Sequence, residues 1–311
     1  MTVATRPAPG ARRRCARPRW QASIAAALAS LLVLSGASGA SFAKPGKHHS
    51  GNVRQAVKKP LPKPPTSRKP ASRPAPLRAA ILIDAETGGV LHEIKPDMPA
   101  YPASLTKMMT LYLTFAALNQ DTLDLNQRLV VSRHAARQEP SKLWLKVGDS
   151  VRVKNLILAL VTRSANDAAV VLAEGLAGSE AAFAERMTAK PRQLGMTNTV
   201  FRNASGLPDP AQRTTARDMA RLALALEQEF PREFDYFSVR EFEFRGQTIT
   251  GHNHLLKTYK GSDGIKTGFT RAAGFNLVAS AERNDRRLIG VILGISNQSS
   301  ANDGSAAPAR I

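Results

Sequence analysis

The sequence predicts an α+β fold: an antiparallel sheet flanked by helices, with an all-helical region inserted between its strands. Two observations predict this fold. Runs with strand character occur at residues 79–94 and return only after residue 238, where the apolar period changes to two. Between them, apolar residues three and four apart dominate, which is the helical period. Because strands from both ends of a domain can complete one sheet, the helices between them form an insertion.

The first strands are predicted at 79–84 and 90–94. The run Ala-Ala-Ile-Leu-Ile-Asp is short and apolar, which is typical of a buried strand. Thr87-Gly88-Gly89 supplies a turn, so the second run returns as the hairpin partner of the first.

Four helical segments are predicted between the strands. The segment 104–118 is apolar on nearly every side, which favours a central, buried helix. The segment 156–177 is strongly helical. The segment 179–194 is followed by Gly195, a residue typical of helix ends, and 214–228 opens with Thr-Thr-Ala-Arg-Asp.

The strands that close the domain follow the last of these helices. A hairpin is predicted from the runs 239–244 and 248–253 around Arg245-Gly246. Three further strands are predicted at 264–269, 274–282 and 287–294, with a turn at 283–285 between the last two. No internal repeat is visible, so a single sheet built from both ends of the domain is expected.

The chain is predicted to have four parts: a signal peptide at 1–43, a linker at 44–78, a folded domain at 79–296 and a disordered tail at 297–311. Arginines precede an apolar stretch of about a dozen residues, which is shorter than the roughly 20 residues of a membrane span. Small residues place cleavage after Ala43, and a retained membrane anchor is the alternative. We therefore expect an exported protein of the periplasm or cell envelope. The only cysteine precedes the cleavage site, so the mature chain has neither disulfides nor thiol catalysis.

The linker 44–78 is basic and rich in proline. It holds eight prolines and ten Lys or Arg, and it has no Asp or Glu, so it cannot bury a core. Of the net charge of +20, six charges lie in 1–43 and ten in the linker, which leaves +4 for 79–311. Since the basicity does not belong to the fold, nucleic acid is not expected as a partner. An anionic wall or membrane surface is the expected partner of the linker, and a solvated spacer is the alternative.

Three short motifs occur in one fixed order: Ser104-Leu-Thr-Lys107, then Ser164-Ala-Asn166, then Lys266-Thr-Gly268. Ser-x-Asn recurs at Ser300-Ala-Asn302, but only the copy at 164 lies between the other two motifs. The order therefore carries more information than any one of the motifs.

Ser104 and Lys107 have the chemistry of an activated nucleophile. Three residues apart at the start of a helix, their side chains share one face, so the amine can reach the hydroxyl. Serine is a weak nucleophile and needs a base. Lysine can be that base only if burial or a second cation lowers its pKa, and Lys266 is the candidate for the cation. The structural alternative is an ordinary helix start, with Ser104 as N-cap and Lys107 on the surface.

The other two motifs also have structural alternatives. Ser164 and Asn166 precede an apolar run, so they could cap a helix. Lys266 could lie on an exposed edge strand. In the functional interpretation, Gly268 leaves room for a substrate backbone along the strand, where Lys266 and Thr267 bind its carboxylate. The active site would be absent only if the structural explanation held for all three motifs at once. The presence of an active site is therefore favoured.

These motifs and their surroundings resemble the low-molecular-mass penicillin-binding proteins, which are serine-type D-alanyl-D-alanine carboxypeptidases of the penicillin-recognising serine hydrolase superfamily. The resemblance covers roughly 78–295 and includes these strings: Ser141-Lys-Leu-Trp144, Lys146-Val-Gly-Asp149, Leu194-Gly-Met-Thr-Asn-Thr199, Thr215-Ala-Arg-Asp-Met219, Asp263-Gly-Ile-Lys-Thr-Gly-Phe-Thr270 and Gly274-Phe-Asn-Leu-Val-Ala-Ser280. It implies a β-lactamase/transpeptidase-like fold. It also implies acyl-enzyme chemistry on the D-Ala-D-Ala end of peptidoglycan stem peptides, and binding of penicillin and other β-lactam antibiotics.

The resemblance further implies a role for each motif residue. Ser104 is the nucleophile and Lys107 its base, and the backbone N–H groups of Ser104 and Phe269 form the oxyanion hole. The remaining groups relay protons and hold the substrate. The implied site residues are Ser104, Lys107, Ser164 and Asn166 for catalysis, and Lys266, Thr267, Gly268 and Phe269 for substrate binding.

Three other functions remain open. A class A β-lactamase needs a Glu-x-x-x-Asn element between the second and third motifs, and residues 167–265 contain none. A DD-endopeptidase, which cuts crosslinks rather than ends, uses the same active site. A catalytically idle wall-binding protein would rely on its basic linker. Product analysis on defined muropeptides separates the enzymes, and absence of penicillin labelling indicates the idle protein.

No metal or cofactor is expected. His252 and His254 would face one side of a predicted strand, which is the start of a metal site. No third ligand is evident, so the pair is not assigned to a metal.

Overall fold

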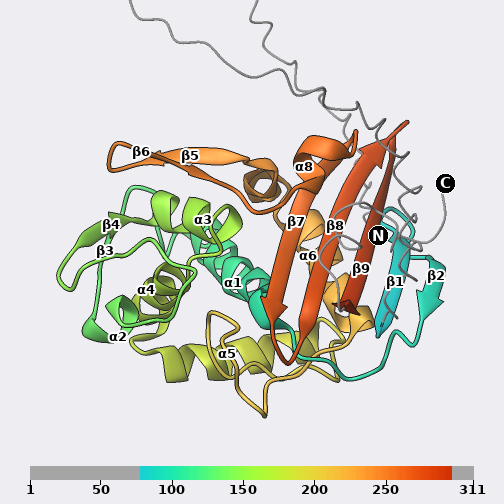
Figure 1. The fold of residues 1–311 in the computed structure, drawn as a ribbon, viewed down its shortest axis with the longest axis horizontal. Helices are drawn as coiled ribbons and strands as arrows, with labels where there is room; N and C mark the ends of the chain where they lie inside the picture. Colours follow the sequence, from blue (N-terminus) through green and yellow to red (C-terminus); the bar gives the residue numbers. More distant parts are fainter. Residues whose placement is uncertain (1–77, 296–311) are drawn as a thin grey trace, which may run out of the picture. The chain divides into compact units, whose positions relative to one another are not determined.

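The computed structural model describes residues 78–295 (Figure 1). The predicted signal peptide, all of the linker except Arg78, and the predicted tail lie outside the described residues. Within them, the α+β fold predicted from the sequence is confirmed: strands at both ends of the described chain enclose a helical region.

One antiparallel sheet holds the first and last strands together. Its five strands lie in the order β2-β1-β9-β8-β7, so the hairpin that begins the domain pairs with the last strand. Residues of β1 and β9 are paired from Ala79 opposite Leu293 to Asp84 opposite Leu288. The strands are β1 (Ala79–Asp84), β2 (Val90–Ile94), β7 (Ser262–Thr270), β8 (Gly274–Arg283) and β9 (Arg286–Ile295). All five were predicted, and β7 is an edge strand.

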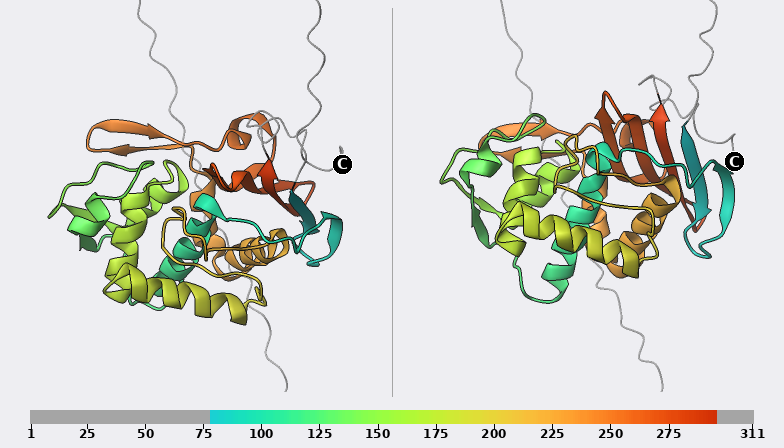
Figure 2. Two further views of the ribbon diagram at one scale, coloured as in Figure 1. Left: turned by 60° about the horizontal axis from the view of Figure 1, so that its bottom comes forward. Right: turned by 90° about the horizontal axis from the view of Figure 1, so that it is seen from below.

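The main helices lie between these strands in the sequence and beside the sheet in space. Ser179 and Thr215 cap their helices by accepting a hydrogen bond from a backbone N–H three residues later. The helices are η1 (Ala103–Thr106), α1 (Lys107–Asn119), α3 (Val153–Val161), α4 (Asn166–Ala177), α5 (Glu180–Gln193) and α6 (Ala216–Glu229). In Figure 2, α6 lies against one face of the sheet, where it packs on β1 and β9.

The prediction of one helix over 156–177 is wrong. The chain leaves the helical conformation after Val161 and resumes it at Asn166, which gives α3 and α4. Ser164 lies in the break: its φ is 58°, a left-handed conformation that a right-handed α-helix does not contain. The break separates two helices whose facing surfaces pack on each other, and it carries the second motif.

Several short elements complete the fold. The hairpin β5 (Glu241–Phe244) and β6 (Gln247–Thr250) was predicted, but its second strand ends at Thr250, three residues earlier than predicted. The sequence did not predict β3 (Arg128–Val130), α2 (Arg133–Ala136), β4 (Ser150–Arg152), α7 (Pro231–Phe234), η2 (Asp235–Ser238) and α8 (Leu255–Thr258). Each of these spans only three or four residues, which is too short for a periodic pattern.

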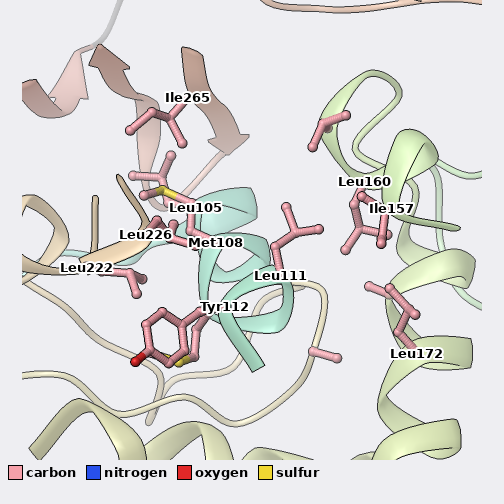
Figure 3. Packing of buried hydrophobic residues seen from close by; sticks show 14 of the residues in the cluster. Leu105, Met108, Leu111, Tyr112, Ile157, Leu160, Leu172, Leu222, Leu226 and Ile265 are labelled. Carbon is pink, nitrogen blue, oxygen red and sulfur yellow. The ribbon is translucent and has the colours of Figure 1, made fainter. Parts of the chain in front are cut away.

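The core is built around α1, as its apolar composition predicted. Figure 3 shows Leu111 of α1 facing Ile157 and Leu160 of α3, while Met108 lies toward Leu222 and Leu226 of α6. The helix thus joins the sheet half of the domain to the helical half. None of the helices between residues 78 and 295 is long and apolar enough to cross a membrane.

Candidate active site

Ser104 and Lys107 lie at the entrance of the central helix. Ser104 belongs to the 3-10 turn η1, and Lys107 is the first residue of α1. Because a 3-10 turn has three residues per turn, side chains three apart lie directly above one another. Lys107 Nζ is 3.4 Å from Ser104 Oγ. The ordinary helix start is contradicted, since no side chain caps η1 and Lys107 is fully buried.

The Lys107 amine has two strong partners besides the serine. Its Nζ donates to Asn166 Oδ1 at 2.7 Å and to the backbone oxygen of Ser205 at 2.5 Å. Burial lowers the pKa of Lys107 well below its ordinary value, and the nearby Lys266 lowers it further, against a smaller opposing effect of Asp167. A neutral amine has two N–H donors and one lone pair. Both donors are used, so the lone pair remains for Ser104.

Ser164 and Asn166 lie at the break between α3 and α4. Neither acts as the N-cap of α4, because Ala165 occupies that position and no side chain caps the helix. Asn166 Nδ2 instead donates to the backbone oxygen of Glu139 at 2.7 Å, which fixes the amide that holds Lys107. Ser164 Oγ is buried without a hydrogen-bond partner among the described residues. Such a hydroxyl is costly to bury unless a ligand or water completes it.

The third motif lies on the edge strand β7. Lys266 is 2% exposed, so a lysine on an exposed strand surface is contradicted. Its Nζ donates to the backbone oxygen of Thr267 at 2.9 Å, and burial lowers its pKa to about 7. Phe269 is 52% exposed and stacks on Phe275 of β8, with ring centroids 4.3 Å apart.

Gly268 is required by the close approach of β7 to η1. A Cβ atom at this position would lie 3.0 Å from the backbone nitrogen of Ser104 and 3.3 Å from that of Leu105. Any side chain would therefore push the strand away from the serine. The first and third motifs meet at this contact, although 158 residues lie between them in the sequence.

One cavity of about 390 Å³ unites the motifs. Lys107 and Lys266 lie buried behind its wall rather than in the lining. A second cavity of about 450 Å³, between β3-β4 and the β5-β6 hairpin, contains none of the predicted site residues. The six predicted site residues in the wall of the first cavity are Ser104, Ser164, Asn166, Thr267, Gly268 and Phe269.

The structure adds positioning groups that the sequence did not single out. Asn276 Nδ2 donates to the backbone oxygens of Tyr101 (2.9 Å) and Pro102 (3.1 Å), which anchors the segment leading into Ser104. The backbone oxygen of Ser205 binds Lys107 through a main-chain group, which leaves no signal in the residue type. Asn276 belongs to the segment 274–280, which resembles the family, but the resemblance did not indicate its positioning role.

The two histidines do not share a strand face as predicted. Strand β6 ends at Thr250, and His252 lies in the loop that follows, where it lines the cavity. Partial desolvation lowers the pKa of His252, and the neighbouring Lys266, Arg163 and His254 lower it further. Among residues 78–295, no group of three His, Cys, Asp or Glu side chains is placed to hold a metal ion.

Known proteins are similar to this chain in sequence and in fold. Residues 68–297 match the family described as D-alanyl-D-alanine carboxypeptidase. The chain is 42% identical over 224 residues to D-alanyl-D-alanine carboxypeptidase DacC of Escherichia coli (strain K12), which covers 70% of this chain and 56% of that protein. The chain thus spans little more than half the length of this curated relative.

Solved structures give the same result. Penicillin binding protein 5 from Haemophilus influenzae superposes with a TM-score of 0.72 at 34% identity, over 76% of this chain and 70% of that chain. Penicillin-Binding Protein D2 from Listeria monocytogenes, in its ampicillin bound form, gives a TM-score of 0.68 at 30% identity, over 74% of this chain and 94% of that chain. The predicted resemblance and the fold that it implied are both confirmed.

Proposed function

Because the chain belongs to the D-alanyl-D-alanine carboxypeptidase family, we propose that it is a serine DD-carboxypeptidase. It removes the terminal D-Ala from peptidoglycan stem pentapeptides through an acyl-enzyme on Ser104, and penicillin acylates the same serine. The observation that carries this proposal is the arrangement of Lys107: a buried lysine of lowered pKa whose N–H donors are engaged, 3.4 Å from a serine hydroxyl.

Acylation starts with Lys107 neutral. The Ser104 hydroxyl donates its proton to the lysine Nζ while the serine oxygen attacks the carbonyl carbon of the penultimate D-Ala. The resulting oxyanion is held by the backbone N–H groups of Ser104 and Phe269. The carbon–nitrogen bond then breaks, and the leaving D-Ala amine takes up one proton. The shortened peptide remains as an ester on Ser104.

The other motif residues assist this step. Ser164, whose hydroxyl has no partner among the described residues, passes the proton from Lys107 to the leaving amine. Asn166 keeps the Lys107 amine in position. Thr267 in the cavity wall binds the terminal carboxylate of the substrate, and Lys266 behind the wall attracts it electrostatically, which favours the charged form of Lys266.

Deacylation reverses these roles. A water molecule enters, gives a proton to neutral Lys107 and attacks the ester carbon, and the Ser104 oxygen leaves and recovers a proton. The products are the peptide lacking its last D-Ala and the free enzyme. With penicillin, opening of the lactam ring forms the ester, and the amine stays tethered to the acyl group.

The test is the site of penicillin attachment. Intact-mass spectrometry after exposure to penicillin is expected to show one adduct, on the peptide that contains Ser104, and none in Ser104→Ala. Ser164→Ala is the matched variant: it retains the adduct at a lower rate, because it loses a relay and not the nucleophile. An adduct that survives in Ser104→Ala contradicts the proposal.

The proposal places this chemistry in the cell envelope, with 1–43 as an export signal. The basic linker 44–78 attaches the enzyme to an anionic wall or membrane surface. A chain starting at Leu77 is expected to hydrolyse a soluble D-Ala-D-Ala peptide as well as one starting at Lys44. At low salt, the chain starting at Leu77 is expected to bind isolated walls more weakly than the chain starting at Lys44, as measured by co-sedimentation. This difference in binding shrinks at higher salt, because salt screens the charges of the linker. Equal wall binding at low salt leaves the linker as a spacer.

A further inference from the structure

The loop between α2 and β4, residues 137–149, presents an exposed tryptophan. Trp144 is 66% exposed, the highest value among the aromatic side chains of residues 78–295. Its φ of 59° lies in the left-handed region, which bulky residues rarely adopt. Strained backbone of this kind persists only where surrounding contacts impose it, and it concentrates at ligand-binding sites.

The buried carboxylate of Asp167 imposes this conformation. Its Oδ1 accepts the backbone N–H of Leu143 at 3.0 Å, and its Oδ2 accepts that of Leu145 at 3.1 Å. The two bonds hold the backbone on both sides of Trp144, so the side chain is directed outward. Asp167 is fully buried and follows Asn166, the residue that binds Lys107.

Lys142 fixes the indole ring. Its Nζ donates to the backbone oxygens of Gln138 (2.7 Å) and Ala136 (3.3 Å), and it lies 4.6 Å from the centroid of the Trp144 ring. A cation at this distance is attracted to the ring face. The ring is therefore held before any ligand arrives. A preorganised side chain loses less conformational entropy when it binds a ligand.

The loop is continuous with the wall of the proposed active site. Pro140 and Ser141 line the cavity that holds Ser104, and the backbone oxygen of Ser141 accepts the N–H of Asn166 at 2.7 Å. Three residues of extended chain span at most about 11 Å. Trp144 thus lies within about 11 Å of the cavity wall but is not part of its lining. A substrate that extends from the cavity past Pro140 and Ser141 would come close to it.

We propose that Trp144 is a stacking platform for an amino-sugar ring of peptidoglycan, so that the enzyme recognises the glycan as well as the peptide end. The inference rests on the proposed function and names a second recognition site for the same substrate. The sugar is the ligand whose shape fits. A pyranose ring presents a flat face of C–H groups that matches an indole face, whereas an extended peptide presents side chains to alternating sides.

The experiment compares two substrates that differ only in the sugar: the disaccharide pentapeptide and the free pentapeptide. Trp144→Ala is expected to lower kcat/KM for the sugar-bearing substrate by about tenfold, the loss of one aromatic contact of ordinary strength. The free pentapeptide and penicillin acylation change by less than about twofold. Trp144→Phe retains most of the sugar preference. Val147→Ala is the matched control, since Val147 lies on the same loop and is 60% exposed but has no flat ring.

Two results would contradict the glycan-binding inference while leaving the proposed function unaffected. One is equal use of the sugar-bearing substrate by Trp144→Ala and the wild type. The other is an equal loss on both substrates, which shows a peptide contact or a displaced loop. A wild-type chain that hydrolyses neither substrate and forms no penicillin adduct instead contradicts the proposed function, and the glycan site with it.

Discussion

The proposed role of Lys107 as a base requires a neutral amine, and its surroundings favour that form. Burial removes the water that would solvate an ammonium group, and Lys266 is a second cation nearby. Asn166 and Ser205 accept its two N–H bonds, so the protein supplies no third acceptor for an ammonium group other than Ser104 itself.

Replacing Lys107 tests this assignment directly. Lys107→Arg places a permanent cation beside the serine, because a guanidinium stays protonated at all working pH values. Penicillin acylation is expected to slow by about 10² or more, as it does when a general base is lost. Stopped-flow or quench measurements of the second-order acylation constant provide the check.

The matched control is Lys260→Arg, the same change at an exposed lysine outside the cavity lining. It is expected to leave the acylation constant unchanged. If Lys107→Arg reacts at nearly the wild-type rate, another group takes the serine proton.

Sequence reasoning singled out the side chains that the structure brings together at the cavity, but not the groups that hold them in place. Ser104, Lys107 and Lys266 were identifiable because their residue types and order carry the chemistry. The backbone oxygen of Ser205 was not, since any residue could supply it. The anchoring role of Asn276 depends on where β8 meets the segment before Ser104, and that contact follows from the tertiary fold alone.

At the scale of elements, the site depends on the distance between β7 and η1. Gly268 allows the strand to lie close to the backbone of Ser104, and an added Cβ would come within 3.0 Å of the Ser104 nitrogen. That contact aligns the two N–H groups proposed for the oxyanion hole. A displacement of even a fraction of an ångström therefore weakens catalysis before it weakens the fold.

Gly268→Ala is accordingly expected to lower the penicillin acylation constant by at least about tenfold. Gly290→Ala in β9 provides the comparison in the same sheet, because a Cβ there meets only a leucine methyl group at 3.7 Å. Acylation rates of both variants measure the loss of activity, and circular dichroism shows whether each variant keeps its fold. An unchanged rate in Gly268→Ala means that the strand can shift without loss.

The sequence predicted the long elements and the sheet partners but not the break at residues 162–165. Apolar residues continue at helical spacing on both sides of it, so the pattern favoured one helix. The left-handed conformation of Ser164 is set by its surroundings. Among them is the hydrogen bond that the backbone N–H of Asn166 donates to the backbone oxygen of Ser141. This contact between segments distant in the sequence overrode the local preference for helix, and it lies at the candidate active site.

For the whole molecule, the two buried lysines make folding dependent on pH. The pKa of Lys266 is about 7 in the folded chain, against an ordinary value of 10.5. Between these values the unfolded chain binds more protons, so the free energy of unfolding rises with pH from about 7 to 10.5. Below pH 7 both states are protonated and the full destabilisation remains. Lys107 acts in the same direction.

Lys266→Met removes the free-energy cost of burying this charge, together with the proposed role of Lys266 in substrate binding. Since each unit of pKa depression corresponds to about 1.4 kcal/mol, the variant is expected to unfold at a Tm several degrees higher at pH 6. The gain narrows steadily as the pH approaches 10. Differential scanning calorimetry across this range provides the measurement. A Tm difference that is independent of pH would show that packing, and not charge burial, separates the two proteins.

The pairing of β1 with β9 has a consequence for the order of folding. Paired residues of these strands are over 200 positions apart in the sequence, and contacts between such distant segments form late. The helical region between β2 and β7 is one continuous segment, so it can assemble around Ser104 and Lys107 before β9 pairs with β1. Lys266 and Phe269 arrive only with the closing strands. On the proposed mechanism, a nascent or half-folded chain therefore carries its serine without the groups that acylation requires, and reaction with penicillin is expected to begin only when the sheet is complete.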